Sequence, residues 1–110
     1  MAKIRLNNDT GAMLGIWIEP WGTDHWMKPG QTFTVVAGHS GPPPSGEVPV
    51  DDVPFDVVVH DQGVSIYVNV VHEASVYDES GTEAHCGHQR PLAVQHAWSE
   101  AAEAAADQAR

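Results

Sequence analysis

The stretch MLGIWIE, residues 13–19, alternates between two kinds of side chain and decides the fold. Aliphatic residues occupy every second position, at Leu14, Ile16 and Ile18. Successive side chains of a β-strand point to opposite faces, so this period of two predicts a strand whose aliphatic face lies on a core. Trp17 falls on the opposite face of the same strand.

Similar short alternating segments follow along the chain, with turn-forming residues between them. This spacing predicts an all-β fold, an antiparallel sandwich of about seven strands with immunoglobulin-like or cupredoxin-like connections. A small barrel is the alternative, and the last three hairpins are expected to form a meander. The predicted strands are 3–7, 13–19, 31–37, 55–60, 64–69, 73–78 and 82–86. Ile4 and Leu6 share one side of the first strand. The residues expected to face the core are Leu14, Ile16, Ile18, Phe33, Val35, Phe55, Val57, Val59, Val64, Ile66, Val68, Ala74, Val76, Ala84 and Cys86.

The chain divides into a predicted sandwich domain, residues 1–90, and an alanine-rich tail, residues 91–110. A segment rich in Pro and Gly, residues 38–54, excludes strand and helix and is expected to cross between two sheets. Pro91 suits the first position of a helix, and an apolar stripe at helical spacing follows it. We expect the tail to be a helix or partly disordered, with Trp98 anchoring it to the sandwich or to a second copy. The stripe comprises Val94, Ala97, Trp98, Ala101 and Ala105.

Composition narrows the classes of function. The 110 residues carry a formal net charge of −10, with five Lys and Arg against fifteen Asp and Glu. Nucleic acids and anionic membranes bind basic surfaces, so neither is expected as a partner, whereas basic proteins and cations remain open. A single cysteine forms no internal disulfide, and no apolar run reaches the length of a signal peptide or a membrane span. We therefore expect a cytoplasmic protein.

Aromatic side chains are the strongest indication of a binding surface. Trp21 and Trp26 fall in a predicted connection, residues 19–33, and Trp17 lies just before it. Aromatic residues on a loop that a rigid sheet holds in place commonly grip a partner, although these two could instead cap the end of the core. The predicted contact residues are Trp17, Trp21, Trp26, Tyr67 and Trp98.

Four segments together resemble a set of small bacterial proteins of uncharacterised function: EPWG, PGQTF, PFDVVVHD and CGHQRP. The similarity covers most of residues 3–91 and leaves the alanine-rich tail outside. It implies a compact β-domain and assigns no catalytic residue.

The segment EAHCGHQRP, residues 83–91, raises the question of a metal site. A sandwich with Cys and His near its last strand is similar to blue-copper proteins, whose sites use a cysteine, two histidines and usually an axial methionine. No Met follows Cys86, and His85 points away from Cys86 as long as the strand continues. We expect this cysteine to be buried and unreactive. The candidate ligands are Cys86 and His88 with His39 or His60 as a third, and also His85.

These observations favour a non-enzymatic binding module whose partner is a protein or a second copy of the chain. The alternative is a copper- or zinc-binding protein that uses Cys86, His88 and another histidine. An enzyme ranks last, because no nucleophile, base and oxyanion donor occur at a recognisable spacing, and no cofactor is expected. Arg90, one of few basic residues, is expected to pair with a carboxylate and to fix the exit of the tail.

Overall fold

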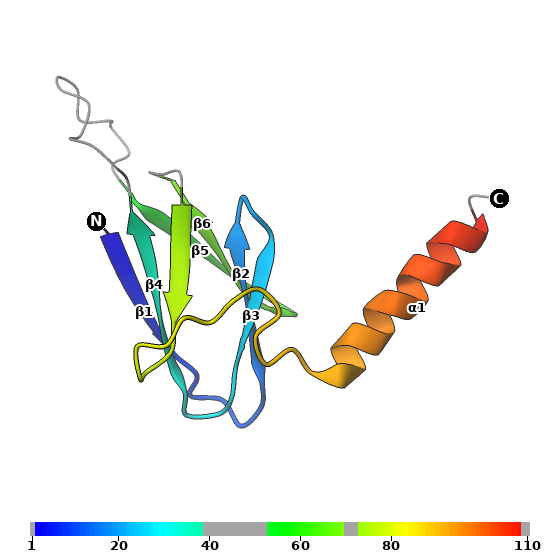
Figure 1. Cartoon of the computed structure of the whole chain (residues 1–110), viewed down its shortest axis with the longest axis horizontal. Coiled ribbons are helices and arrows are strands. Elements are labelled where there is room, and N and C mark those ends of the chain that lie inside the picture. Colours follow the sequence, from blue (N-terminus) through cyan, green and yellow to red (C-terminus); the bar gives the residue numbers. More distant parts are fainter. Residues whose placement is uncertain (1, 39–52, 70–72, 109–110) are drawn as a thin grey trace, which may run out of the picture.

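The structure, a computed structural model, describes residues 2–38, 53–69 and 73–108. Within these ranges two β-sheets pack face to face, and one helix extends from them (Figure 1). This confirms the predicted all-β sandwich with a C-terminal helix. The elements are β1 (Ala2–Asn7), β2 (Leu14–Glu19), β3 (Thr23–Met27), β4 (Thr32–Gly38), β5 (Phe55–His60), β6 (Gly63–Val68), β7 (Glu73–Tyr77) and α1 (Leu92–Gln108).

The pairing of the strands departs from the predicted one in two places. The first sheet contains three antiparallel strands in the order β1-β4-β7, and the second contains four in the order β3-β2-β6-β5. β2 and β6 run parallel, so this sheet is mixed, whereas the sandwich was predicted to be antiparallel. Parallel neighbours need a long connection, and here β3, β4 and β5 lie between them in the sequence. The predicted meander is also wrong, because β7 leaves β6 and pairs with β4 in the other sheet.

The inner faces of both sheets form one apolar core. Ile16, Ile18 and Ile66 of the four-stranded sheet share it with Phe33 and Val35 of the three-stranded sheet. All five are at most 2 % exposed. The alternating pattern predicts these positions, and the structure confirms them. The other buried members are Met27, Ala37, Val64, Val68, Val76 and Ala84.

β3 is a strand that the sequence pattern does not reveal. Four of its five residues are buried, so the polar Asp24 and His25 lie beside the apolar Trp26 and Met27 with no alternation. A strand covered on both faces loses the period of two on which the prediction depends. The predicted connection at 19–33 therefore contains this strand between two short turns.

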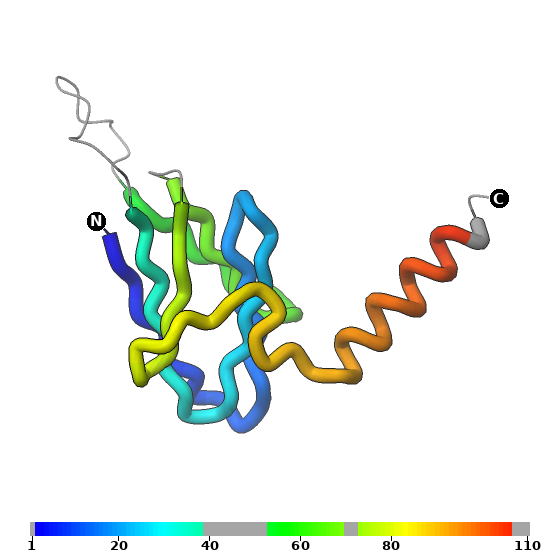
Figure 2. The backbone as a smooth tube through the Cα atoms, in the orientation of Figure 1, coloured from blue at the N-terminus to red at the C-terminus, as the bar shows by residue number. Residues whose placement is uncertain are grey.

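The predicted last strand, residues 82–86, is wrong, because the chain there forms a different structure. We call residues 83–90 the closing segment, since it crosses from β7 to β3 and joins the two sheets on that side (Figure 2). Its residues contact both sheets by isolated bridges rather than pairing along one strand. The bridges join Tyr77 with Glu83 and His25 with His88. The backbone hydrogen bonds run from Ala84 N–H to Val76 O (2.7 Å), from Gly87 N–H to Asp24 O (2.7 Å) and from Trp26 N–H to His88 O (3.0 Å).

β5 is an edge strand of the four-stranded sheet, and its apolar side chains are exposed. Val57 and Val59 point to the inner face but are 45 % and 79 % exposed, so the prediction that they face the core is wrong. Phe55, at the start of the strand, does pack against the core. The three-stranded sheet is one strand narrower than its partner sheet and leaves this part of the inner face uncovered.

α1 projects away from the sheets rather than lying along them (Figure 1). Leu92 is 72 % exposed and Trp98 is 43 % exposed, and Val94 is the half-buried member of the predicted stripe. The helix therefore contributes little to the core. In the part of the chain that the structure describes, no helix has the length and hydropathy to cross a bilayer.

Candidate functional site

The outer face of the four-stranded sheet brings together three of the five predicted contact residues, Trp17, Trp26 and Tyr67. Strand register arranges its side chains in rows that cross β3, β2, β6 and β5. The first row contains Trp26, Gly15, Gly63 and His60. The second contains Asp24, Trp17, Ser65 and Val58, and the third contains Glu19, Tyr67 and Asp56.

Two glycines leave the space in which the Trp17 ring lies. A Cβ atom on Gly15 would come within 2.8 Å of this ring, and a Cβ atom on Gly63 would come within 3.1 Å. The ring meets Trp26 edge-on, with centroids 5.5 Å apart, and His60 with centroids 5.6 Å apart. Trp17, Trp26 and His60 therefore form an aromatic cluster that holds three strands in register, since such pairs add about 0.5–1.5 kcal/mol each beyond the area they bury.

Asp24 joins the aromatic cluster to the closing segment. Its Oδ2 accepts hydrogen bonds from Trp26 Nε1 (2.9 Å) and Arg90 Nε (2.7 Å), and its Oδ1 accepts one from Arg90 Nη2. Burial raises the pKa of this carboxyl, but the bonds from Arg90 and Trp26 outweigh burial and lower the pKa to about 2. The two parallel bonds from the guanidinium confirm the prediction that Arg90 pairs with a carboxylate where the tail leaves the sandwich.

Arg90 also links α1 to the sandwich. Its guanidinium carbon lies 4.9 Å from the centroid of the Trp98 ring, which is a cation–π contact. Trp98 is therefore anchored through a charged side chain and not through the apolar core. Its ring keeps an exposed fraction of 43 %, so it remains a surface residue.

The two tryptophans expected on one loop lie in different places. Trp21 is in the turn between β2 and β3 and is 42 % exposed, whereas Trp26 is inside β3 and 7 % exposed. The prediction that Trp26 lies on a loop is therefore wrong, and its ring belongs to the aromatic cluster. Trp21 is the member of the pair whose ring a partner could reach without any rearrangement.

Cys86 is exposed, so the prediction that it is buried beside Ala84 is wrong. The strand-like pairing ends at Glu83, and a turn follows in which Gly87 has a φ of 83°. The thiol donates a 3.6 Å hydrogen bond to Oδ1 of Asp24. A nucleophilic cysteine needs a neighbouring base, and a carboxylate with a pKa of about 2 is too weak a base for that role.

The histidines considered as metal ligands do not converge on Cys86. His60 is in β5, three strand spacings or roughly 14 Å from β3, beside which Cys86 lies. The side chain of His85 is 79 % exposed, and the ring of His88 packs 5.9 Å from the ring of Phe33. Among the described residues, no group of three His, Cys, Asp or Glu side chains could hold a metal ion. His39 lies outside the described residues.

His25 is a buried histidine that the sequence pattern did not single out. It is 4 % exposed, its Nε2 lies 3.0 Å from Thr23 Oγ1, and burial lowers its pKa, so the ring is neutral at pH 7. With His85 and Cys86 it lines a cavity of about 130 Å³ beneath the closing segment. This volume is smaller than the roughly 300–1,000 Å³ of typical small-molecule sites.

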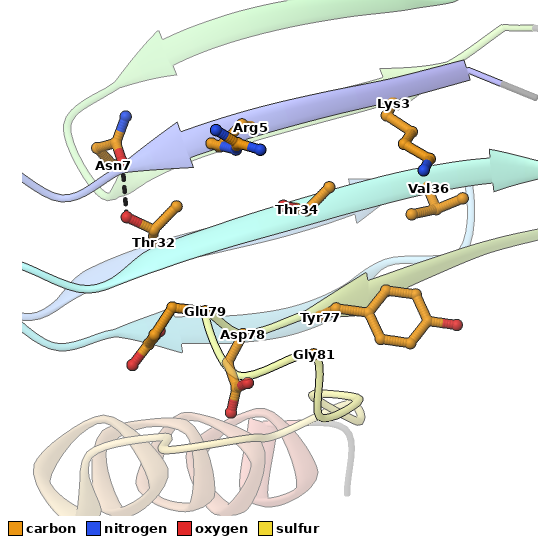
Figure 3. Close-up of a pocket in the computed structure, with 10 residues that line it drawn as sticks. All are labelled: Lys3, Arg5, Asn7, Thr32, Thr34, Val36, Tyr77, Asp78, Glu79 and Gly81. Carbon is orange, nitrogen blue, oxygen red and sulfur yellow. Dashed lines mark hydrogen bonds between the residues drawn. The ribbon is translucent and has the colours of Figure 1, made fainter.

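A wider hollow of about 720 Å³ lies on the outer face of the three-stranded sheet (Figure 3). Lys3 and Arg5 of β1 line one side of it, and Asp78 and Glu79 lie on the other. These charges could bind a polar group, but small-molecule sites are usually enclosed and mostly apolar, whereas this one is open and polar. In the sequence, this hollow is indicated by the polar residues that alternate with apolar ones in β1, which are Lys3, Arg5 and Asn7. The remaining lining residues are Asn7, Thr32, Thr34, Val36, Tyr77 and Gly81.

Exposed apolar side chains gather at β5 and β6. Val57, Val58 and Val59 are 45 %, 46 % and 79 % exposed, and Tyr67 on the neighbouring strand is 45 % exposed. The three valines alternate between the two faces of the sheet, so the strand presents apolar surface on both sides. Contiguous exposed apolar surface marks interaction sites in soluble proteins.

Comparison with protein-family models, with curated proteins and with solved structures finds no match to this chain. The resemblance to small bacterial proteins therefore stays a prediction.

Proposed function

We propose that this chain is a non-enzymatic binding module that contacts a protein through β5 and the adjoining outer face of the four-stranded sheet. The observation that carries the proposal is the run of three exposed valines, 57–59, on an edge strand. An edge strand offers unpaired backbone groups together with side chains on both faces, which is the surface that another polypeptide can extend.

The aromatic cluster supports this proposal by fixing the strands behind the contact surface. Trp17 connects β2 with His60 of β5, so the edge strand is held by side-chain packing as well as by its pairing with β6. A rigid surface loses little conformational entropy on binding. The arrangement of Asp24 and Cys86 adds no base or nucleophile that would favour an enzyme.

A photo-crosslinking experiment tests the proposal with a matched pair of tyrosines. Tyr67 lies on the outer face beside β5, and Tyr77 lies on the outer face of the other sheet. Each is replaced in turn by benzoylphenylalanine, and the full chain is irradiated in cells and as purified protein. We expect adducts that contain a polypeptide from Tyr67→benzoylphenylalanine and none from the Tyr77 variant.

The adducts distinguish the outcomes. Mass spectrometry of a Tyr67 adduct identifies the crosslinked chain as a second copy or as another protein, and either result supports a protein-binding face. Equal crosslinking from both tyrosines, or none from Tyr67, would overturn the proposal. Circular dichroism of each variant confirms that the sandwich is folded.

A further inference from the structure

β5 is the edge strand that the described residues leave both apolar and uncovered. The closing segment bonds to the free edge of β3 and to part of β7. β1 carries Lys3 and Arg5, and charged residues on an edge strand oppose further pairing. Along Val57–Val59, β5 has no covering segment among the described residues and no charged side chain, so its edge is the one suited to accept another strand.

The register with β6 shows which backbone groups of β5 face outward. His60 pairs with Gly63 across a turn of two residues, and such a closing pair exchanges its backbone hydrogen bonds. Hydrogen-bonded and non-hydrogen-bonded pairs alternate along an antiparallel ladder. The backbone groups of Asp56 and Val58 therefore also bond to β6, whereas those of the alternate residues do not. The N–H and C=O groups that point to the free edge belong to Phe55, Val57 and Val59.

A second copy can extend this edge by two-fold symmetry in two registers. A two-fold axis perpendicular to the sheet must place inner residues opposite inner residues, so it passes through a residue and not between two residues. An axis through Val57 or through Val58 pairs the greatest length of β5. An axis at Val58 places Asp56 opposite His60 of the second copy, and it does so twice. An axis at Val57 places Asp56 opposite Val58 of the second copy, where the carboxylate gains no partner.

Cross-strand neighbours on one face lie within about 5 Å, so the choice of register has energetic weight. One oxygen of Asp56 already accepts a hydrogen bond from Asn69 Nδ2 (2.7 Å), and both atoms lie on the exposed surface. The His60 imidazole is also exposed, with Nε2 2.9 Å from Ser65 Oγ. Its Nδ1 accepts a hydrogen bond from Gln62 N–H (3.2 Å), so Nε2 carries the proton, and a carboxylate opposite the ring can accept that N–H in place of Ser65 Oγ. Complementary side chains therefore favour the register centred on Val58.

We propose that a second copy of this chain pairs antiparallel with β5, with Val58 on the two-fold axis and Asp56 opposite His60 of the second copy. The inference rests on the proposed protein-binding role of β5 and names its partner. It makes one continuous eight-stranded sheet from two four-stranded sheets. It also pairs Val57 with Val59 of the second copy, which shields these inner-face valines from water. A contact through one six-residue edge strand is expected to bury less than the ~1,600 Å² of a standard interface, so we expect a dissociation constant in the micromolar range.

Sedimentation equilibrium of the full chain tests the proposal, at concentrations from about 1 μM to about 1 mM. We expect a monomer–dimer equilibrium that Val58→Lys weakens at least tenfold, because it places two ammonium groups together on the axis. Leu92→Lys is the matched control, since it adds the same charge at an exposed apolar residue of α1 and should leave the dissociation constant unchanged. A chain that stays monomeric throughout this range would overturn the inference.

Charge exchange tests the register separately. His60→Asp alone opposes two carboxylates across the axis and should weaken the dimer several-fold relative to His60→Asn, which removes the same ring from Trp17 without adding a charge. Adding Asp56→His to that variant restores opposite partners in the Val58 register and should restore the affinity. Failure of the double variant to recover, while both variants melt as folded proteins, would exclude this register.

Amide hydrogen exchange gives a reading that does not depend on any substitution. The amides of Val57 and Val59 should gain protection as the concentration rises, whereas the Val58 amide, already bonded to β6, should change little. Loss of this contrast would also overturn the inference. A Tyr67 adduct with a different protein, found together with a monomeric chain, would leave the proposed function standing and remove the second copy as its partner.

Discussion

Asp24 shows how one residue can connect three parts of a small protein. Its carboxylate accepts hydrogen bonds from Trp26 of the aromatic cluster, from Arg90 of the closing segment and from the thiol of Cys86. A buried charge is tolerated only when paired and hydrogen-bonded, and here both oxygens are used. The junction between sandwich and tail therefore depends on a side chain that is 3 % exposed and lies in a strand that the sequence pattern does not predict.

The pKa of Asp24 leads to a prediction about acid stability. Its pKa falls from 3.8 to about 2 on folding, so the stabilisation is complete above about pH 4 and is lost as pH falls through 2. A shift of this size corresponds to about 2 kcal/mol. We expect the difference in unfolding free energy between the wild type and Asp24→Asn to shrink by about that amount from pH 6 to pH 2. Urea unfolding at both pH values measures it, and a pH-independent difference would contradict the prediction.

At the scale of single residues, the sequence predicts which side chains form the core but not which polar ones are buried. Alternation placed Ile16, Phe33 and Ile66 inside correctly, because these strands have one apolar face each. It gave no sign of Asp24 or His25, whose burial results from contacts made by the distant closing segment. Alternation also places Cys86 inside, but the strand-like pairing ends at Glu83 and the period of two no longer holds beyond it.

Among the elements, β3 and the closing segment show where local patterns stop being informative. β3 is buried on both faces and has no alternation, while residues 82–86 alternate but contact two different sheets. The sequence predicts seven strands and the described residues contain seven, but the two sets differ, because β3 is present and the predicted strand at 82–86 is not. The helix was predictable from composition, since alanine-rich sequence and Pro91 suffice for it.

The position of α1 leads to a prediction about its contribution to stability. The helix projects from the sandwich and contacts it through Trp98 on Arg90. Deleting residues 92–110 should therefore change the unfolding free energy by less than about 1 kcal/mol. Arg90→Ala leaves Asp24 buried without its cation and should cost about 2–4 kcal/mol. Urea unfolding followed by circular dichroism compares the two variants, and a larger loss from the deletion would show that the helix packs on the sheets.

For the whole molecule, strand order was beyond the reach of the sequence pattern. Pairing between β2 and β6 joins segments far apart in the chain, and nothing in either segment specifies the other as its partner. The unequal width of the two sheets follows from this order, and it exposes Val57 and Val59, which alternation assigns to the core. The sequence therefore predicts that residues 55–60 form a strand, but it does not predict that this strand is an exposed edge.

The net charge of the molecule sets the salt dependence of the proposed dimer. Each copy carries a formal charge of −10, so two copies repel at long range, and salt screens that repulsion. The contacts between Asp56 and His60 of the second copy are short-range hydrogen bonds at the exposed surface, which salt screens less than it screens the repulsion between the net charges. We expect the dimer to tighten several-fold between about 0.05 M and 0.5 M NaCl, as the Debye length shortens to a few ångströms. Sedimentation equilibrium across this range measures the effect. A dimer that weakens with salt would show that short-range charge pairs, and not apolar contacts of β5, provide most of the attraction.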